Sequence, residues 1–277
     1  MRYSLMSGAG NLFAVLDGFA DALPADPAAL ARALCAGPAA GGLDPRPDGL
    51  LIVRPARRGG ACAMELYNAD GSRPETCGNG LRCAAKLAFE HGHVRATRFV
   101  IEADAGPSET EVELERGKVV RARNGMGVPR VIERNAHIEL AERAPVHATL
   151  VDMGNPHCVV FVEDERTAPV AELGPRLERH ARFPHGTNVE FLALGRTHAA
   201  LRVWERGVGE TAACGSGACA AAAAAQALAL ARLPLALHLP GGILEVSADE
   251  RGALQLAGPV EELMSGVYSG LHGQPAR

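Results

Sequence analysis

Apolar and polar residues alternate along several short segments of the chain, a pattern typical of strands with one buried face. Glycine and proline turns separate these segments. The predicted strands include residues 49–53, 63–67, 151–153, 158–162 and 201–204. Two longer stretches are predicted helices, residues 81–91 closed by Gly92 and residues 218–233 closed by Pro234.

The second predicted helix is apolar almost all round, and a helix without a polar face must be enclosed on all sides. Its alanines let neighbouring strands approach closely. Each half of the chain is therefore predicted to form a curled, mostly antiparallel sheet around a central helix. The fold class that follows is α+β, with two pseudo-symmetric domains.

One short motif occurs twice, as Cys77-Gly78-Asn79-Gly80 and as Cys214-Gly215-Ser216-Gly217, with an offset of 214 − 77 = 137 residues. The same offset places residues 64–67 on residues 201–204. A polar residue, Asn68 or Glu205, stands nine positions before each cysteine. The repeat predicts two similar domains that present one thiol each to an active site in the cleft between them. We expect the first domain to span 1–122 with about 259–277, and the second to span 123–258.

Composition narrows the class of protein. The net charge of −4 comes from interspersed acids and bases, which argues against a nucleic-acid partner. Residues 1–8 reach a glycine too early for a signal peptide, and the uncharged run 212–231 is mostly alanine, so neither export nor a membrane role is expected. Seven cysteines, an odd number, predict free thiols in a reducing compartment, the cytoplasm.

Two cysteines at helix starts suggest acid–base chemistry, because the positive end of the helix dipole favours a thiolate. If Cys77 and Cys214 flank one carbon about 7 Å apart, one removes a proton while the other delivers one to the opposite face. The stereocentre is then inverted. Backbone N–H groups of Gly78, Asn79, Gly215 and Ser216 are placed to stabilise an α-carboxylate that gains enolate-like charge.

No cofactor or metal is expected. Lys86 and Lys118 are the two lysines of the chain, which leaves few candidates for a pyridoxal phosphate Schiff base. The cysteine spacings lack Cys-x-x-Cys, and the histidines form no ligand pair on a helix. His157 and Glu205 are the candidates for tuning the pKa of the two thiols; alternatively, they are a satisfied loop histidine and a solvated strand-end carboxylate.

Three segments closely resemble the diaminopimelate epimerase family: residues 68–72 leading to 77–83, residues 153–157, and residues 204–211 leading to 214–219. The resemblance runs nearly end to end. It implies a homodimeric, cofactor-independent isomerase that interconverts LL- and meso-diaminopimelate for lysine and peptidoglycan synthesis. By motif, Cys77 and Cys214 would be the acid–base pair, and Gly78, Asn79, Gly215 and Ser216 would hold the reacting carboxylate. Further substrate contacts would come from Asn11, Asn68, Asn155, Asn188, Glu205 and Arg206.

Two other functions stay open at the level of sequence. One is a related racemase acting on another amino acid, as proline racemases do, although Glu205 and Arg206 suit a substrate with a second charged head. The other is a thiol redox protein, whose expected Cys-x-x-Cys is missing. The family's glycine-rich segment before residues 48–51 is replaced here by a proline-bearing stretch, which we expect to be a surface loop over residues 36–48.

Overall fold

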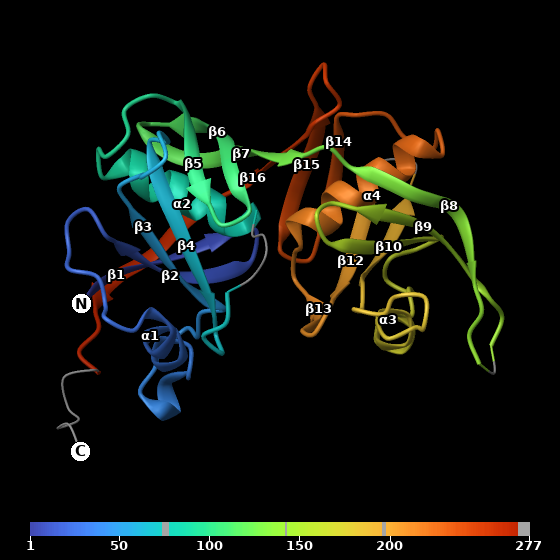
Figure 1. Ribbon diagram of the computed structural model, residues 1–277, viewed down its shortest axis with the longest axis horizontal. Coiled ribbons are helices and arrows are strands. Elements are labelled where there is room, and N and C mark those ends of the chain that lie inside the picture. Colours follow the sequence, from blue (N-terminus) through green and yellow to red (C-terminus); the bar gives the residue numbers. More distant parts are fainter. Residues whose placement is uncertain (74–77, 142, 196–197, 271–277) are drawn as a thin grey trace. The chain divides into compact units, whose positions relative to one another are not determined.

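The computed structural model describes residues 1–73, 78–141, 143–195 and 198–270 (Figure 1). Contacts between residues divide the chain into two compact units. Unit 1 comprises residues 1–124 and 258–277, and unit 2 comprises residues 125–257. Unit 1 is thus closed by a segment that returns from the far end of the chain.

Unit 1 is a sheet in which eight strands follow one another in the order β17-β1-β2-β3-β4-β5-β6-β7. Neighbours are antiparallel except for the pairs β2–β3 and β4–β5, which are parallel. Helix α1 (Pro27–Leu34) precedes β3, and helix α2 (Gly78–Glu90) precedes β5. The strands are β1 (Arg2–Gly8), β2 (Asn11–Asp17), β3 (Gly49–Arg54), β4 (Cys62–Asn68), β5 (Arg98–Ala103), β6 (Gly106–Glu115), β7 (Lys118–Gly127) and β17 (Glu261–Val267). A 3-10 turn at Pro38–Ala40 interrupts the predicted surface loop.

Unit 2 repeats this plan with the order β8-β9-β10-β11-β12-β14-β15-β16. Its parallel pairs are β10–β11 and β12–β14, and the short β13 (Gly209–Thr211) pairs with β12. Helix α3 (Val170–Glu178) precedes β11, and helix α4 (Gly215–Ala227) precedes β14. The strands are β8 (Arg130–Ile138), β9 (Val146–Asp152), β10 (Pro156–Val162), β11 (Asn188–Leu194), β12 (Ala199–Glu205), β14 (Leu235–Leu239), β15 (Gly242–Ala248) and β16 (Leu254–Pro259).

The sequence repeat has a direct structural counterpart. Strand β4 and helix α2 correspond to β12 and α4, and each of their bounds shifts by the 137 residues that separate the cysteine motifs (62 to 199, 68 to 205, 78 to 215, 90 to 227). Both units also share the same alternation of hairpins and parallel crossings. The predicted class, α+β with two pseudo-symmetric domains, is confirmed.

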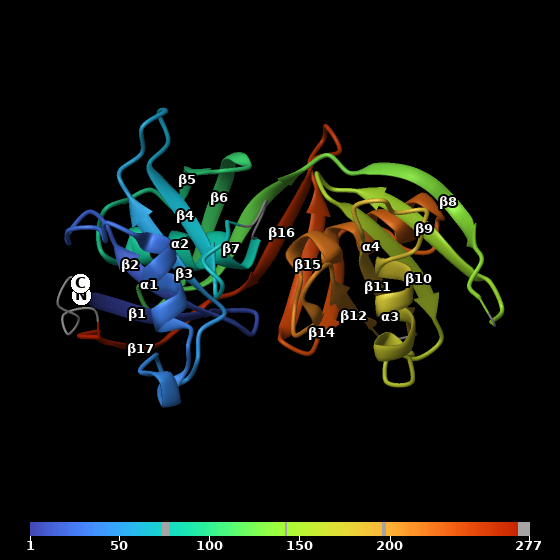
Figure 2. The same ribbon diagram turned by 60° about the horizontal axis from the view of Figure 1, so that its bottom comes forward.

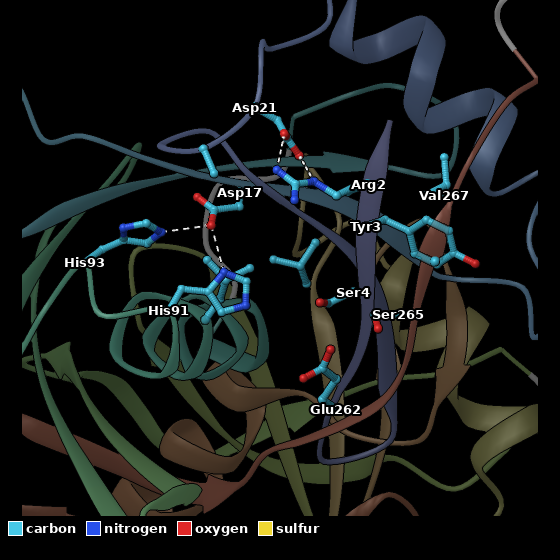
Figure 3. A pocket seen from close by; sticks show the side chains of 14 residues that line it. Arg2, Tyr3, Ser4, Asp17, Asp21, His91, His93, Glu262, Ser265 and Val267 are labelled. Atoms are coloured by element: carbon cyan, nitrogen blue, oxygen red, sulfur yellow. Dashed lines mark hydrogen bonds and ion pairs between the residues drawn. The ribbon is translucent and has the colours of Figure 1, made fainter.

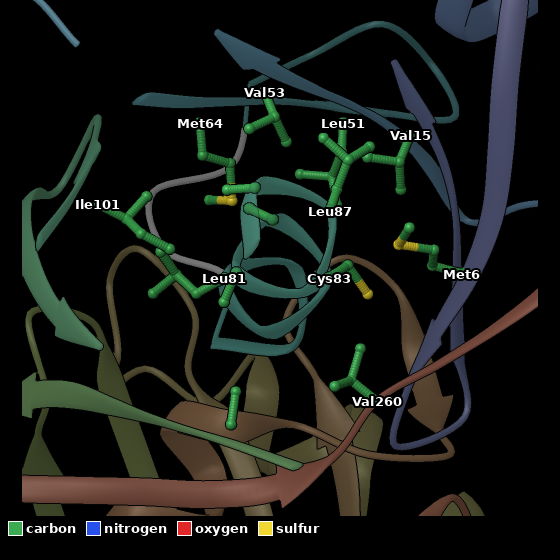
Figure 4. Close-up of a cluster of buried hydrophobic side chains, with 14 of the residues drawn as sticks. Met6, Val15, Leu51, Val53, Met64, Leu81, Cys83, Leu87, Ile101 and Val260 are labelled. Atoms are coloured by element: carbon green, nitrogen blue, oxygen red, sulfur yellow. The ribbon is translucent and has the colours of Figure 1, made fainter. Parts of the chain in front are cut away.

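Each unit encloses its central helix (Figure 2). In unit 1 the side chains of Leu81, Cys83 and Leu87 on α2 pack among buried residues of the strands, including Leu51 and Met64 (Figure 4). In unit 2 nearly every residue of α4 is buried, as the apolar sequence predicted. No helix in the described part of the chain is long and apolar enough to cross a membrane.

The predicted helix limits were less accurate than the helices themselves. Both helices begin three residues earlier than predicted, at Gly78 and Gly215, so the Gly-x-Gly elements form their first turns. The predicted end of the second helix at residue 233 was wrong, because α4 stops at Ala227. Ala229 there takes a left-handed conformation (φ 57°), and Leu230 N donates to Ala225 O at 2.9 Å. The left-handed residue that follows a helix is usually glycine, so an alanine at this position gave no sign in the sequence that the helix ends here.

Candidate active site

Cys214 caps the N-terminus of α4. Its backbone is extended (φ −126°, ψ 117°), and its Sγ accepts the N–H of Gly217 at 3.4 Å. The Ser216 Oγ lies 3.5 Å from the same sulfur. The thiol is therefore held by the first turn of the helix, where backbone N–H groups have no carbonyl partner within the helix.

The surroundings of Cys214 favour the thiol over the thiolate. Burial raises the pKa of Cys214 well above its ordinary value, and the negative charges of Glu205 and Glu190 add to this effect. The contacts with Ser216 and the Gly217 N–H oppose it without reversing it. The helix start favours a thiolate, as the sequence predicts, whereas burial and the two carboxylates favour the thiol. A thiol whose pKa is raised in this way holds a proton that it is able to donate.

A buried pair of ionisable residues lies against the first turn of α4. His157 on β10 and Glu190 on β11 have side chains with no exposed surface, and His157 Nδ1 lies 2.7 Å from Glu190 Oε1. On its other side, His157 Nε2 lies 3.0 Å from Asn155 Oδ1. Glu190 also reaches the helix, since a Cβ added at Gly217 would stand 2.8 Å from Glu190 Oε1. His157 is thus linked through Glu190 to the first turn of α4.

Burial raises the pKa of Glu190, and the interaction with His157 opposes this rise. Within the described residues Glu190 Oε2 has no hydrogen-bond partner. The charge of this buried carboxyl group acts on both His157 and Cys214, so its protonation affects both residues. Sequence analysis missed Glu190. It stands in the apolar strand segment 188–194, and only the pairing of β10 with β11 brings it to His157.

Glu205 ends β12, and Arg206 begins the turn that follows. Thr211 Oγ1 donates to Glu205 Oε1 at 2.6 Å. The backbone N–H of Arg206 donates to Asn188 Oδ1 at 3.0 Å, and Asn188 Nδ2 donates to Pro156 O at 3.1 Å. The backbone of Arg206 is thus bonded to Asn188, and Glu205, its neighbour in the chain, is bonded to Thr211.

Glu178, a residue that the sequence did not indicate, supports the same turn. It ends α3 and is buried, and its carboxylate accepts Trp204 Nε1 at 2.7 Å and the Gly207 N–H at 2.8 Å. The two bonds bracket Glu205 and Arg206 along the chain. Glu205 and Arg206, two of the predicted substrate contacts, therefore lie in a segment that is fixed on either side.

The predicted half-site of unit 1 is only partly visible, because Cys77 lies outside the described residues. Gly78 and Asn79 form the first turn of α2, and Asn79 Nδ2 donates to Asn11 Oδ1. Asn11 in turn donates to Asp48 Oδ2 at 3.3 Å. The structure therefore brings together Asn11 and the turn that directly follows Cys77.

Arg82 orients this cluster from inside the protein. Its side chain is fully buried, and it donates to Asn79 Oδ1 at 2.6 Å and to Gly78 O at 3.2 Å. Because Oδ1 of Asn79 accepts from Arg82, the amide nitrogen must face Asn11. Asn68 has a different local role, since its Nδ2 donates to Ser72 Oγ at 3.0 Å in the turn after β4. Its described contacts do not join it to Asn79.

Comparison with known proteins identifies relatives over almost the whole chain. The family profile described as "Diaminopimelate epimerase" matches residues 3–132 and 149–263. A protein named diaminopimelate epimerase from Geobacillus thermodenitrificans is 38% identical over 288 residues, covering 98% of each chain. One of the same name from Desulforudis audaxviator is 40% identical over 285 residues, covering 97% of this chain and 99% of its own.

Solved structures with the same architecture are more distant in sequence. A probable proline racemase from Agrobacterium radiobacter superposes with a TM-score of 0.72 at 18% identity, covering 97% of this chain and 92% of its own. A predicted epimerase from Pseudomonas aeruginosa gives 0.70 at 19% identity, covering 96% and 98%. At these identities the likeness establishes the fold and leaves the substrate to be argued from the site.

Proposed function

The chain belongs to the diaminopimelate epimerase family, and from this premise we propose that it interconverts LL- and meso-diaminopimelate by two-base proton transfer at one α-carbon. Cys77 and Cys214 are the proposed acid–base pair. The observation that carries the proposal in the described residues is the position of Cys214, a buried thiol that caps the first turn of α4 with its sulfur 3.5 Å from Ser216 Oγ. The reaction serves lysine and peptidoglycan synthesis in the pathway that uses this substrate.

In the proposed step, the thiolate of one cysteine takes the α-proton, and the S–H of the other gives its proton to the opposite face of the same carbon. The raised pKa of Cys214 makes it the donor in one direction of the reaction. Cys77 is then the base, and the roles exchange in the reverse direction. No net proton is gained or lost, and the enzyme needs no cofactor for this step.

The carbanion that forms between the two transfers requires strong stabilisation. We propose that backbone N–H groups of Gly78 and Asn79 on α2, and of Gly215 and Ser216 on α4, hold the reacting carboxylate. Helix starts at both motifs support this assignment. Asn11 is placed to contribute to carboxylate binding through its hydrogen bond with Asn79. His157, which contacts Asn155 and Glu190, is placed to influence the protonation of Cys214.

Substrate choice depends on the second amino acid head of diaminopimelate. We propose that Arg206 pairs with its carboxylate and Glu205 with its ammonium group, while Asn68 and Asn188 complete the polar contacts. The bonds from Trp204 and Gly207 to Glu178 support this role, since they fix the chain on either side of one anionic and one cationic residue. A racemase for a small amino acid has no use for such a pair.

The two compact units are the proposed catalytic domains, each supplying one thiol. We further propose a homodimer that works in the cytoplasm. Strand β17 supports the dimer, because Leu263, Met264 and Val267 are exposed apolar side chains on it. Free thiols at Cys35, Cys62 and Cys158 suit a reducing compartment. Sedimentation of the purified protein is expected to give twice the mass of the chain, and a monomer would contradict the dimer.

The isotope content of the product tests the reaction. Incubation with LL-diaminopimelate in deuterated water is expected to give meso product with deuterium at the inverted α-carbon, because the donor thiol exchanges its proton with solvent. The matched incubation with L-proline is expected to give neither inversion nor exchange. Turnover of proline, or inversion with the original hydrogen fully retained, would contradict the proposal. Mass spectrometry and chiral chromatography read both reactions.

A further inference from the structure

A cluster of two histidines and one aspartate lies in unit 1, apart from the residues of the proposed reaction (Figure 3). Asp17 is the last residue of β2, and His91 and His93 follow the end of α2. His91 Nδ1 lies 2.7 Å and His93 Nε2 lies 2.8 Å from the same oxygen, Asp17 Oδ2. Asp17 precedes His91 by 74 residues, so the cluster could not be predicted from the spacing of these residues in the sequence.

The backbone holds the two histidines at one end of α2. His91 N donates to Leu87 O at 3.0 Å, and Val94 N donates to Ala88 O at 3.0 Å. Between the histidines, Gly92 takes φ +76°, which turns the chain so that both rings return to one carboxylate. The ligand positions are thus set by a hydrogen-bonded helix end.

Contacts around the rings fix their orientation as well. Asp17 Oδ1 accepts the Phe19 N–H at 3.0 Å, which turns Oδ2 toward the histidines. The ring of Phe19 stacks on His93 at 4.1 Å between centroids, with 7° between the planes. A metal ion would replace the two hydrogen bonds and meet one carboxylate oxygen and two oriented imidazole nitrogens in their unprotonated form.

From this arrangement we propose that Asp17, His91 and His93 bind a divalent transition-metal ion of the zinc type. Two imidazole nitrogens and one carboxylate oxygen are a donor set that such ions prefer. Zinc bonds of about 2.1 Å place tetrahedral ligands about 3.3 Å apart, so the cluster must open by roughly half an ångström. The side chain of His91 is 40% exposed and is free to make that adjustment.

The remaining coordination position would face a cavity of about 590 Å³. Ser4, Glu262 and Ser265 also line this cavity and offer oxygen atoms to water or to a small ligand of the ion. Arg2 is near as well, but its guanidinium donates to both carboxylate oxygens of Asp21, at 3.1 and 2.7 Å. The local cation therefore has its own counter-ion and does not repel the metal strongly.

The ion would tie the end of β2 to the end of α2. Helix α2 has 13 residues and is about 20 Å long, and its other end follows Cys77. A metal at this site would therefore stabilise the helix that carries the reactive motif, without touching the reacting atoms. Binding to the folded state alone must raise the stability of the protein.

A Co²⁺ titration of the metal-free, full-length protein tests the site. One equivalent is expected to bind with the weak visible absorption of nitrogen and oxygen ligands, without the intense near-ultraviolet band that thiolate ligands give. His93→Ala and Asp17→Asn are each expected to weaken metal binding by more than about tenfold. Loss of a residue that only hydrogen-bonds to a metal ligand already costs about tenfold, and these two residues are the proposed ligands themselves. Zn²⁺ should raise the melting temperature of wild type and of neither variant.

The matched control is the double variant His137→Ala/His147→Ala, which removes another close histidine pair, with ring centroids 5.2 Å apart. It should bind Co²⁺ like wild type. His91→Ala, at a more exposed position, replaces His93→Ala if circular dichroism shows that the latter is unfolded. Absence of stoichiometric binding, or binding that survives in folded His91→Ala and Asp17→Asn, would overturn the proposal. A thiolate band would instead locate the metal at the cysteines.

Discussion

Replacing Cys214 by alanine is expected to lower kcat about a thousandfold or more while leaving unit 2 folded. General acid–base groups contribute factors of about 10² to 10⁴, and inversion needs a donor on one face and a base on the other. The protonated Cys214 thiol supplies the donor in one direction, and alanine cannot replace it in either direction. Cys77→Ala is expected to cause a loss of the same order. Steady-state rates in both directions measure the effect.

Cys219→Ala is the matched control for this experiment. Cys219 lies on the same helix, five residues after Cys214, and is fully buried among the alanines of α4. Its loss should leave kcat within a few-fold of wild type and should lower stability slightly, as expected when a small buried side chain is truncated. Substantial turnover in Cys214→Ala or Cys77→Ala would exclude the two-base scheme. Equal losses in the control would show that packing of α4, rather than the thiol, sets the rate.

The repeat, the presence of a helix after each cysteine motif and the fold class could be predicted because they depend on local patterns. Cys-Gly-x-Gly followed by an alanine-rich stretch marks a helix start wherever it occurs, and two copies at a fixed offset imply two similar units. The polar residues before each cysteine were found in the same way. Asn68 and Glu205 both end a strand, β4 and β12, as their common spacing indicates.

Contacts between distant segments could not be predicted from those patterns. Glu190 looks like the polar position of an ordinary strand until β11 is paired with β10 and it meets His157. Arg82 looks like a solvated helix residue, yet it is fully buried against Asn79. The burial of Cys214 is a further example, since the helix start is evident in the sequence and the burial that raises the pKa of the thiol is not.

Among these contacts between distant segments, the His157–Glu190 pair is expected to have the largest effect on stability. His157→Leu should lower the free energy of unfolding by about 3 kcal/mol or more at pH 8. The change leaves a buried carboxyl group without its imidazole. In wild type, burial raises the pKa of Glu190 and His157 opposes this rise, so the pKa should rise further in the variant. The native state then binds its proton more tightly than the unfolded chain does.

The sign of the pH dependence follows from that difference. A carboxyl group whose pKa is raised in the folded state stabilises the fold fully only below the pKa of the unfolded chain, about 4.3 for glutamate. The contribution disappears as the pH rises toward the folded-state value. Urea unfolding should therefore show a larger loss for His157→Leu at pH 8 than at pH 5. Adding Glu190→Gln should remove most of the difference between the two pH values. Equal losses at both pH values would mean that the carboxyl of Glu190 does not become uncompensated when His157 is lost.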